Sequence, residues 1–408
     1  MSVVITGMGC VTALGWSVEE FWSALISKKS GISNIESFDA SDLPVSIAGE
    51  IKNFPAQDFF GPKRARQYSK YIHYGCGAAK LALEHSGLLD SNIDKTRVAV
   101  VVGTGMGGIE VFHENVIKSH TKGPKRISPF FIPMSIPNMQ SGIIAIDYGF
   151  LGPNYSISTA CATGNHCIIN GAMLIESKMA DVVIVGGSEA SINLSGLGGF
   201  CAQKALSLST DPTSASKPFD INRNGFVAGE GAGVLVLESE EHAKKRKANI
   251  LARYLGGGMS SDAHHLTAPH PEGLGAARAM SLALSSAQLN PNQIDYINAH
   301  GTSTKLGDLA EVKAIHSVFK EDSSRVKVSS TKSMIGHSLG AAAAIEAIVA
   351  VQTIRDGKIH PTDNLENQDP ECDLNVVTKD AYETNVDNVL SNSFGFGGHN
   401  ASIILGKY

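Results

Sequence analysis

Two apolar runs dominate the hydrophobic pattern of this chain. Residues 167–175 and 339–354 are apolar on nearly every face that a helix would present, yet both runs are too short to cross a membrane. Helices of this kind must be buried on all sides. Shorter runs at 98–103 and 182–186 are rich in valine and end in glycine, as buried strands commonly do. The pattern therefore predicts an α/β protein with two helices at its centre.

The order of predicted elements occurs twice along the chain. Each half contains a buried strand, a helix, a turn that opens one of the two apolar helices, and two closing strands. The matched segments are 98–103 with 294–299, the turn at Cys161 with the turn at 330–337, and the closing strands 182–186 and 233–238 with 389–394 and 401–405. Little sequence identity accompanies this order, so the repeat is one of elements rather than residues. We predict two similar halves, residues 1–250 and 251–408, that form a five-layer α-β-α-β-α core of predominantly parallel strands.

Charge and cysteine content narrow the choice of function. The formal net charge of −5 argues against a general nucleic-acid or anionic-membrane binder. None of the six cysteines forms a C-x-x-C pair, so we expect reduced thiols rather than a disulfide framework. We find no secretory signal and no run of about 18 apolar residues. We therefore expect no nucleic-acid or membrane partner, and a cytoplasmic location, or the plastid stroma if a transit peptide has been removed.

Cys161 lies where a β-prone lead-in meets small residues and then the first all-apolar helix. This pattern places the thiol on a sharp strand-to-helix turn, at the positive end of a helix dipole. Unpaired backbone N–H groups there favour a thiolate, so we expect a lowered pKa and a nucleophilic role. The alternative is a buried structural thiol. Cys167, which lies inside the same helix, fits that alternative and should be inert.

Three further segments place polar groups at strand or helix ends. His300 follows the strand 294–299, His337 precedes the second apolar helix, and a glycine-rich segment at 393–398 follows a closing strand. Because these positions are equivalent in the repeat, the segments can converge on one pocket with Cys161. One histidine beside a cysteine suits hydrolysis or acyl transfer. Two imidazoles can also hold the carbonyl of a second substrate and stabilise its enolate, which then attacks an acyl group held on the thiol.

Three shorter motifs are weak by comparison. Residues 103–108 match the G-x-G-x-x-G pattern of dinucleotide-binding folds, but basic residues stand where an acidic one is expected, which favours a close-packed turn. The S-x-x-K at 329–332 lacks the partner motifs of the serine enzymes that use it. The Asp and His residues at 262–265 lack a metal-ligand spacing.

Four longer motifs resemble those of the β-ketoacyl-acyl-carrier-protein synthases of the thiolase superfamily. They are S-T-A-C-A at 158–162, N-A-H-G-T-S-T at 298–304, S-S-T-K-S-M-I-G-H at 329–337 and N-S-F-G-F-G-G at 392–398. The resemblance extends over essentially the whole chain. It implies a thiolase-like fold and a decarboxylating Claisen condensation of acyl-acyl-carrier protein with the malonyl-loaded carrier, in type II fatty acid elongation. It also implies a homodimer that requires no cofactor, because the acyl carrier protein brings its own phosphopantetheine arm.

The resemblance assigns catalytic roles to six residues of these motifs and of the helix after His300. Cys161 would accept the acyl chain. His300 and His337 would bind the malonyl thioester carbonyl and stabilise the enolate formed as CO₂ leaves. Lys332 would set the local electrostatics together with Glu311, and Phe396 would be the gate beside the nucleophile.

The other implied roles fall into three groups. The residues implied to contact substrate are Met106, Phe200, Thr302 and Thr304, with Phe131 from the second subunit. Those implied to dock the carrier protein are Lys63, Arg64, Arg66 and Lys204. The first three stand at the start of a helix predicted to run through to Ser86, and a solvated helix start is the alternative reading. Those implied to hold a structural cation are Asn298, Glu346, Ser391 and Asn392, because their oxygens suit a hard ion.

Two positions depart from the common pattern: His399 stands where many bacterial members have threonine, and Lys204 replaces a frequent arginine.

Three related activities compete with this assignment. A thiolase would carry a second catalytic cysteine in the glycine-rich segment 392–400, where this chain has none; Cys372 lies well upstream. A non-catalytic chain-length subunit would lack the nucleophile, which is present. A polyketide ketosynthase shares the chemistry and stays open, as does the choice between type I and type II behaviour of the fatty acid enzyme.

Overall fold

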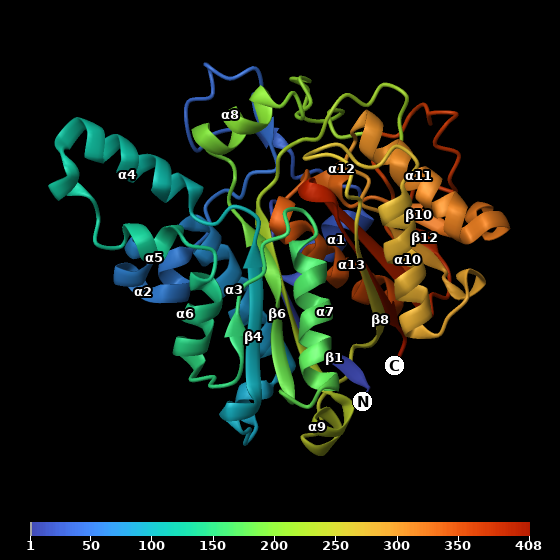
Figure 1. The fold of residues 1–408 in the computed structure, drawn as a ribbon, viewed down its shortest axis with the longest axis horizontal. Coiled ribbons are helices and arrows are strands. Elements are labelled where there is room, and N and C mark those ends of the chain that lie inside the picture. Colours follow the sequence, from blue (N-terminus) through green and yellow to red (C-terminus); the bar gives the residue numbers. More distant parts are fainter. Residues whose placement is uncertain (1) are drawn as a thin grey trace.

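A ten-stranded sheet forms the centre of the protein (Figure 1). The computed structural model describes residues 2–408, and within them two small two-stranded sheets accompany the large one. The strands, in chain order, are β1 (Val3–Val11), β2 (Ser33–Asn34), β3 (Ile47–Ala48), β4 (Val98–Thr104), β5 (Asn154–Tyr155), β6 (Val182–Glu189), β7 (Gly231–Ser239), β8 (Ala252–Ser261), β9 (Tyr296–Asn298), β10 (Lys327–Ser329), β11 (Lys358–Ile359), β12 (Tyr382–Glu383), β13 (Asn388–Gly395) and β14 (His399–Gly406).

Helices cover both faces of this sheet. They are α1 (Val18–Ile26), α2 (Ala56–Gln67), α3 (Lys70–Ser86), α4 (Ile109–Lys122), α5 (Phe131–Ser135), α6 (Met139–Tyr148), α7 (Thr163–Glu176), α8 (Leu194–Ala202), α9 (Glu240–Lys245), α10 (Leu274–Ala287), α11 (Lys305–Phe319), α12 (Lys332–Ile335) and α13 (Ala342–Asp356). A short 3₁₀ turn, η6 (Leu339–Ala341), precedes α13.

The large sheet consists of two five-stranded halves joined along one edge. Its strand order is β10-β9-β13-β14-β8-β1-β7-β6-β4-β5. The first five strands in this order, β10 to β8, lie after residue 250 in the chain. The last five, β1 to β5, lie before it. The halves meet where β1 pairs with β8 over three residue pairs, from Val3 with Tyr254 to Ile5 with Ala252. So short a junction leaves each half free to form a layer of its own.

Alternate residues of each strand face different cores, because successive side chains of a strand point to opposite sides. In β4, Ala99 and Val101 belong to a central core with α7 and α13, whereas Val98, Val100 and Val102 face α3 on the outer side. The second half has an outer core of its own, formed with α10 and α11. Figure 1 shows α7 and α13 between the two halves of the sheet. The predicted five-layer α-β-α-β-α core is therefore confirmed.

Small residues allow the two central helices to touch. A Cβ atom at Gly164, in the first turn of α7, would lie 2.5 Å from the backbone nitrogen of Ala344 in α13. Such a distance is well inside normal contact, so only glycine lets the two backbones approach this closely. The N-terminal ends of α7 and α13 therefore lie side by side. Cys161 and His337 come shortly before those ends in the chain.

The structure corrects three expectations about the elements. The sheet is mixed rather than predominantly parallel, because β7 and β14 run antiparallel to both of their neighbours. The basic helix α2 ends at Gln67 and a separate helix α3 begins at Lys70, because Tyr68 and Ser69 between them have extended backbone angles. The prediction also lacks β8 and α10. Three consecutive glycines at 256–258 interrupt the apolar pattern of β8, and its pairing with β14 supplies the strand instead.

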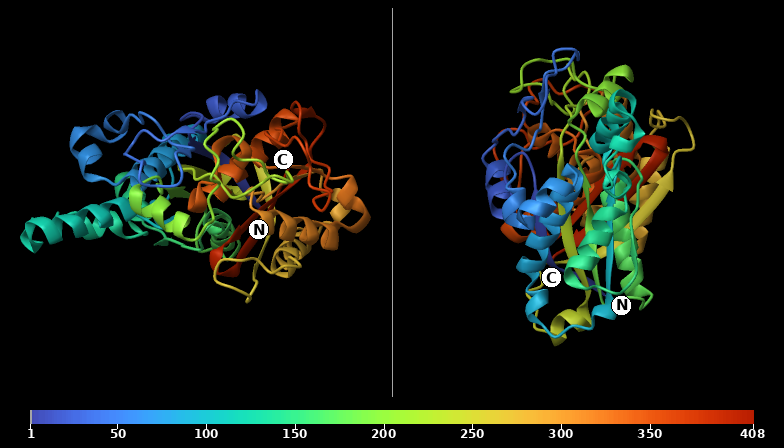
Figure 2. Two further views of the ribbon diagram at one scale, coloured as in Figure 1. Left: turned by 90° about the horizontal axis from the view of Figure 1, so that it is seen from above. Right: turned by 90° about the vertical axis from the view of Figure 1, so that its left-hand side faces the viewer.

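The helix α4 projects from the body as an arm (Figures 1 and 2). Its side chains Phe112, Val116 and Ile117 are each about half exposed, at 54%, 49% and 48%. The ring of Phe112 packs against that of Phe131 in α5, with 5.5 Å between the centroids. Among residues 2–408, none of the helices has the length and apolar character needed to cross a bilayer.

We expect the effect of a substitution at Gly164 on the free energy of unfolding to come mainly from the contact between the central helices. Gly164→Ala should lower the free energy of unfolding by about 1–3 kcal/mol, because the added methyl group pushes α7 away from α13. Gly142→Ala in α6 is the matched control, since no atom lies within 4 Å of a Cβ placed there. That variant should be as stable as the parent or slightly more so, because alanine favours a helix over glycine by about 0.5–1 kcal/mol. Urea unfolding followed by circular dichroism measures both changes, and equal effects of the two substitutions would contradict the packing argument.

Candidate active site

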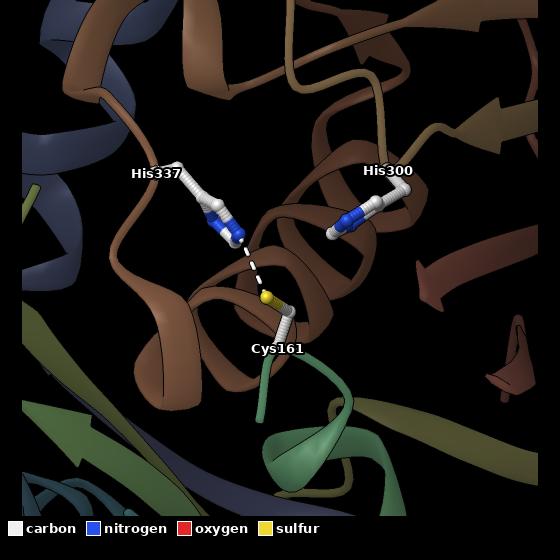
Figure 3. A group of neighbouring side chains, drawn as sticks. All are labelled: Cys161, His300 and His337. Atoms are coloured by element: carbon white, nitrogen blue, oxygen red, sulfur yellow. Dashed lines mark hydrogen bonds between the residues drawn. The ribbon is translucent and has the colours of Figure 1, made fainter. Parts of the chain in front are cut away.

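Cys161, His300 and His337 converge on one point (Figure 3). One donor or acceptor atom from each of the three side chains lies within 4.8 Å of the others, and all three residues are buried. The Nε2 atom of His337 is 2.9 Å from the Sγ atom of Cys161. The two imidazole rings are nearly perpendicular, with 5.3 Å between their centroids. The predicted convergence of the two histidines on the cysteine is what the structure contains.

The turn that carries Cys161 is held from both sides. Ala160, directly before it, has a left-handed backbone angle of φ +50°, which is a strained conformation for a residue with a side chain. The Ser393 hydroxyl donates to the Cys161 carbonyl at 2.7 Å. A Cβ atom at Gly395 would lie 3.0 Å from the Cys161 nitrogen, so the glycine-rich segment after β13 packs directly on the turn. These contacts fix the direction in which the sulfur points.

Burial changes the expectation for the Cys161 thiol. Removal from solvent raises its pKa to about 12, although Lys332 and the backbone N–H groups of Phe396 and Cys161 itself act in the opposite direction. The sequence-based expectation of a lowered pKa is therefore wrong for the resting enzyme. The helix end and its N–H groups are present, but a charged sulfur without water around it is more costly than these groups can offset.

The same burial keeps both histidines neutral. Desolvation lowers the pKa of His300 and of His337 well below the ordinary value, and the positive charge of Lys332 adds to this. Among the residues that the structure describes, the Nδ1 atom of neither ring has a hydrogen-bond partner. A neutral ring has one proton, and placing it on Nε2 directs the N–H toward the point where the three side chains meet. Each imidazole can therefore act as a neutral hydrogen-bond donor there.

Backbone contacts orient the two rings. The carboxylate of Glu311 accepts hydrogen bonds from the backbone N–H groups of His300 and Gly301, both at 2.8 Å. The backbone N–H of His337 donates to the carbonyl of Val227 at 2.7 Å. Each histidine is thus held through its main chain, while its ring remains free to face the cavity.

The expected pairing of Lys332 with Glu311 is not found. Lys332 forms a buried ion pair with Glu346 in α13, and both side chains are 1% exposed. Glu311 instead accepts hydrogen bonds from the main chain after β9. Burial raises its pKa, and the N–H groups of Gly301 and His300, the Asn392 side chain and the charge of Lys332 oppose that effect. The sequence could not distinguish the two carboxylates, because either one lies on a helix that the fold could bring to Lys332.

The four residues implied to hold a cation are all buried near this ion pair. Three of them have an oxygen without a partner among the described residues: Oδ1 of Asn298, Oε2 of Glu346 and Oγ of Ser391. The side-chain oxygen of Asn392 is already occupied, because it accepts from Ser402 at 2.7 Å. Unpaired buried oxygens are costly, and a hard cation would satisfy them. Asn298, Glu346 and Ser391 therefore fit such an ion, while the Asn392 oxygen already accepts one hydrogen bond.

A cavity of about 620 Å³ opens onto the three side chains. Six of the residues with an implied substrate, gating or docking role line it, namely Met106, Phe200, Lys204, Thr302, Thr304 and Phe396. The hydroxyls of Thr302 and Thr304 lie 3.0 Å apart. Phe131 is not among the lining residues of its own chain and packs on α4 instead.

The predicted basic cluster lies on α2 and is also outside the cavity lining. Lys63 and Arg66 are exposed. Arg64 is ion-paired with Asp147, and its guanidinium group lies 5.6 Å from the centre of the Tyr68 ring. Only Lys63 and Arg66 therefore present an unengaged positive charge in this cluster.

Four residues at the site were missed by the sequence reading. Phe226 packs edge-on against His337, with centroids 5.3 Å apart, and Phe394 packs against His300 at 5.7 Å. Leu339 and Glu189 also line the cavity. Of these, only Glu189 leaves a signal in the sequence, since it is a charged residue at the end of a run that otherwise reads as a buried strand.

Fold and site together define a class of protein. A cysteine and two histidines at matched ends of a duplicated five-layer core form the site of a thiolase-fold condensing enzyme. Family models agree with this conclusion: the N-terminal domain of β-ketoacyl synthases matches residues 1–243, and the C-terminal domain matches residues 251–366. The chain belongs to the β-ketoacyl synthase family.

Individual relatives are similar over the full chain. A barley protein described as chloroplastic 3-oxoacyl-[acyl-carrier-protein] synthase I is 48% identical, covering 100% of this chain and 89% of the relative. A 3-oxoacyl-[acyl-carrier-protein] synthase 2 of Coxiella burnetii is 46% identical, covering 99% of this chain and 98% of the relative. The crystal structure of a β-ketoacyl synthase from Burkholderia phymatum has a TM-score of 0.93 at 33% identity, covering 100% of this chain and 99% of that one.

We expect the reactivity of Cys161 to follow a raised rather than a lowered pKa. Between pH 7 and 9 the rate of alkylation by iodoacetamide should rise about tenfold per pH unit, because the thiolate fraction does so well below the pKa. Lys332→Met should slow alkylation further, because the positive charge that favours the thiolate is lost. Mass spectrometry of the labelled peptide separates Cys161 from the buried Cys167. A rate that is already constant from pH 7 upward would show that the thiol rests as a thiolate paired with a protonated His337.

Proposed function

We propose that this protein is a β-ketoacyl-acyl-carrier-protein synthase that elongates acyl chains in type II fatty acid synthesis. The observation that carries the proposal is the meeting of one thiol and two neutral imidazoles within 4.8 Å, at the end of a cavity. Relatives described as 3-oxoacyl-[acyl-carrier-protein] synthases, at 46–49% identity, support the same substrate class.

In the first half-reaction, Cys161 takes the acyl group. Its sulfur attacks the carbonyl carbon of the acyl-carrier-protein thioester, and the bond to the phosphopantetheine sulfur breaks. The thiol proton ends on the departing phosphopantetheine thiol. The backbone N–H groups of Phe396 and Cys161 both face the sulfur, so they can donate to the carbonyl oxygen as negative charge develops on it. The acyl chain then extends into the cavity beside Met106 and Phe200.

In the second half-reaction, the malonyl thioester replaces the departed carrier. Its carbonyl oxygen accepts from the Nε2–H groups of His300 and His337, and neutral donors suffice to hold the enolate oxygen. The C–C bond to the carboxylate breaks, CO₂ leaves, and the electron pair forms the enolate. The enolate carbon attacks the acyl group on Cys161, the C–S bond breaks, and the sulfur takes up a proton from solvent. The products are CO₂ and the 3-oxoacyl chain on the carrier protein.

We propose the acyl carrier protein as the partner that delivers both substrates. Thr302 and Thr304 line the cavity with hydroxyls that can bind the phosphopantetheine arm. Lys204 is at the same cavity, and Lys63 and Arg66 on α2 add exposed positive charge for an acidic carrier. A ketosynthase of a type II polyketide synthase has been solved in complex with its acyl-carrier protein, and it matches this chain with a TM-score of 0.93 at 31% identity, covering 100% of this chain and 99% of that one.

We also propose a homodimer in the cytoplasm or the plastid stroma. Two features support the dimer: β5 is an edge strand of the large sheet, and the arm α4 exposes a row of apolar side chains next to Phe131. Two relatives described as chloroplastic support the stromal alternative. Sedimentation velocity of the whole chain would decide the oligomeric state.

A structural cation is a further proposal, and the enzyme needs no other cofactor. Asn298, Glu346 and Ser391 would hold the ion through their unpaired oxygens. Its charge would offset that of the buried Glu346 carboxylate, which also pairs with Lys332. The ion takes no part in bond making. A thermal midpoint that does not respond to the identity of the monovalent or divalent salt would count against it.

An elongation assay tests the function. With acyl-carrier-protein substrates of graded chain length and malonyl-carrier, the enzyme should form one 3-oxoacyl product and one CO₂ per acyl group. Cys161→Ala should form no product and take up no acyl label, because the acceptor sulfur is gone. Cys167→Ala is the matched control and should retain both activities. Elongation by the Cys161→Ala variant would overturn the assignment, and repeated condensation to unreduced poly-β-keto chains would favour the polyketide alternative.

The docking surface has a separate test. Reversing the charge of Lys63 and Arg66 to glutamate should raise the apparent KM for acyl-carrier protein by about tenfold at low salt, with kcat nearly unchanged, because rim charges act mainly on association. The difference from the parent should shrink as salt is added. Lys245→Glu on α9 is the matched control, since it changes the same kind of charge on another exposed helix. An unchanged KM in the double variant would remove α2 from the docking surface.

A further inference from the structure

Glu189 is a fully buried carboxylate that the mechanism does not use. It ends β6, is 0% exposed, and lines the cavity next to Cys161. Four donors surround it. Oε1 accepts from the Thr104 hydroxyl at 3.0 Å and from the Met106 N–H at 3.2 Å. Oε2 accepts from the N–H groups of Gly105 at 2.9 Å and Gly340 at 3.1 Å.

These donors belong to two walls of the acyl cavity that come from different halves of the protein. Thr104, Gly105 and Met106 follow one another at the end of β4, in the first half. Gly340 lies in η6, which leads into α13 of the second half. Met106 is one of these donors, and Leu339 directly precedes the donor Gly340. The side chains of both belong with Cys161 to one apolar cluster. Glu189 therefore connects the two walls between which an acyl group on Cys161 must extend.

The second wall is strained and tightly packed. Leu339 has a left-handed backbone angle of φ +47°, although it is not glycine. An L-residue in this region is disfavoured by about 1–2 kcal/mol, so the surrounding contacts must hold it there. The neighbouring Gly340 is part of those contacts. A Cβ atom there would lie 2.9 Å from Oε2 of Glu189, and one at Gly105 would lie 2.5 Å from the same oxygen.

The arrangement requires a carboxylate rather than any polar side chain. Every neighbour within hydrogen-bonding distance is a donor, and a glutamine could accept at only one of its two terminal atoms. Its NH₂ group would face the N–H groups of Gly105 and Gly340. Burial raises the pKa of Glu189 to about 7, and the donors from Gly340, Thr104, Met106 and Gly105 oppose that effect by favouring the ionised form.

We propose that Glu189 is a positioning residue that sets the acyl-chain preference of the enzyme, by holding the Met106 wall and the Leu339 wall of the cavity at a fixed separation. The inference rests on the proposed synthase function. It concerns the acyl half-reaction alone, because the main chain of His337 is held independently: its N–H donates to Val227, and its carbonyl accepts from Gly229 at 2.9 Å. Loss of the hydrogen bonds to Glu189 should therefore disturb acyl binding while the malonyl site stays intact.

The test compares Glu189→Gln with the parent across acyl-carrier-protein substrates of graded length. We expect kcat/KM for the longest accepted acyl chains to fall about tenfold, the loss typical of a buried hydrogen bond to a charged group, and that for the shortest chains to fall less. Longer chains contact more of both walls, so they depend more on the separation. Malonyl decarboxylation by the acyl-free enzyme should stay within about twofold of the parent. Thr104→Val, which removes a single donor, should shift the chain-length profile in the same direction by a smaller factor. This variant replaces Glu189→Gln in the test if the glutamine variant folds poorly.

The matched control is Glu238→Gln. Glu238 is also 0% exposed, and it lies beside Val182 at the far end of the β6–β7 pairing, where Glu189 is opposite Gly231. This variant should lower the thermal midpoint without altering the chain-length profile. An unchanged profile in Glu189→Gln, or an equal loss for every chain length and for decarboxylation, would overturn the positioning role. If the parent enzyme itself does not elongate acyl chains, the proposed function fails rather than this inference.

Discussion

The direct contact between α7 and α13 is the constraint on which the site depends. Gly164 lets the two helices approach until backbone meets backbone, and the sheet halves then close around them. The turn with Cys161 precedes one helix, and the segment with His337 precedes the other. Since both helices begin at the same end of the core, the contact delivers a sulfur and an imidazole nitrogen to within 2.9 Å across 176 residues of chain. A loop could not hold two such distant segments with comparable accuracy.

The chemistry follows from how little solvent reaches this point. Burial raises the pKa of Cys161 and lowers that of both histidines, so the resting site holds neutral groups that act by hydrogen bonding. The charged pair of Lys332 and Glu346 lies behind them. Removal of either partner would leave a lone buried charge, which explains why the two must be considered together. Negative charge that develops on a bound carbonyl oxygen meets N–H donors already in place.

Duplication of the fold has produced equivalent positions with different roles. The end of β9 carries His300, whereas the matching end of β4 carries Met106 in the acyl cavity. The segment before α7 carries Cys161, whereas the one before α13 carries His337 and then the strained Leu339. Contacts across the pseudo-repeat, such as that of Glu189 with Gly340, connect the half that carries Cys161 to the half that carries the two histidines.

Much of this protein could be predicted from the sequence, because strong local patterns coincide with unambiguous chemistry. All-round apolar helices can only be central, and their two N-terminal turns mark the positions of Cys161 and His337. The family motifs added Thr302, Thr304, Lys332 and Phe396 to the candidate site. What the sequence could not determine depends on distances between segments far apart in the chain. The partner of Lys332 is Glu346 rather than Glu311, because only packing decides which helix faces it. The pKa of Cys161 rises rather than falls, because the helix end is a local property that the sequence reveals, whereas exclusion of water is a collective property of the folded core.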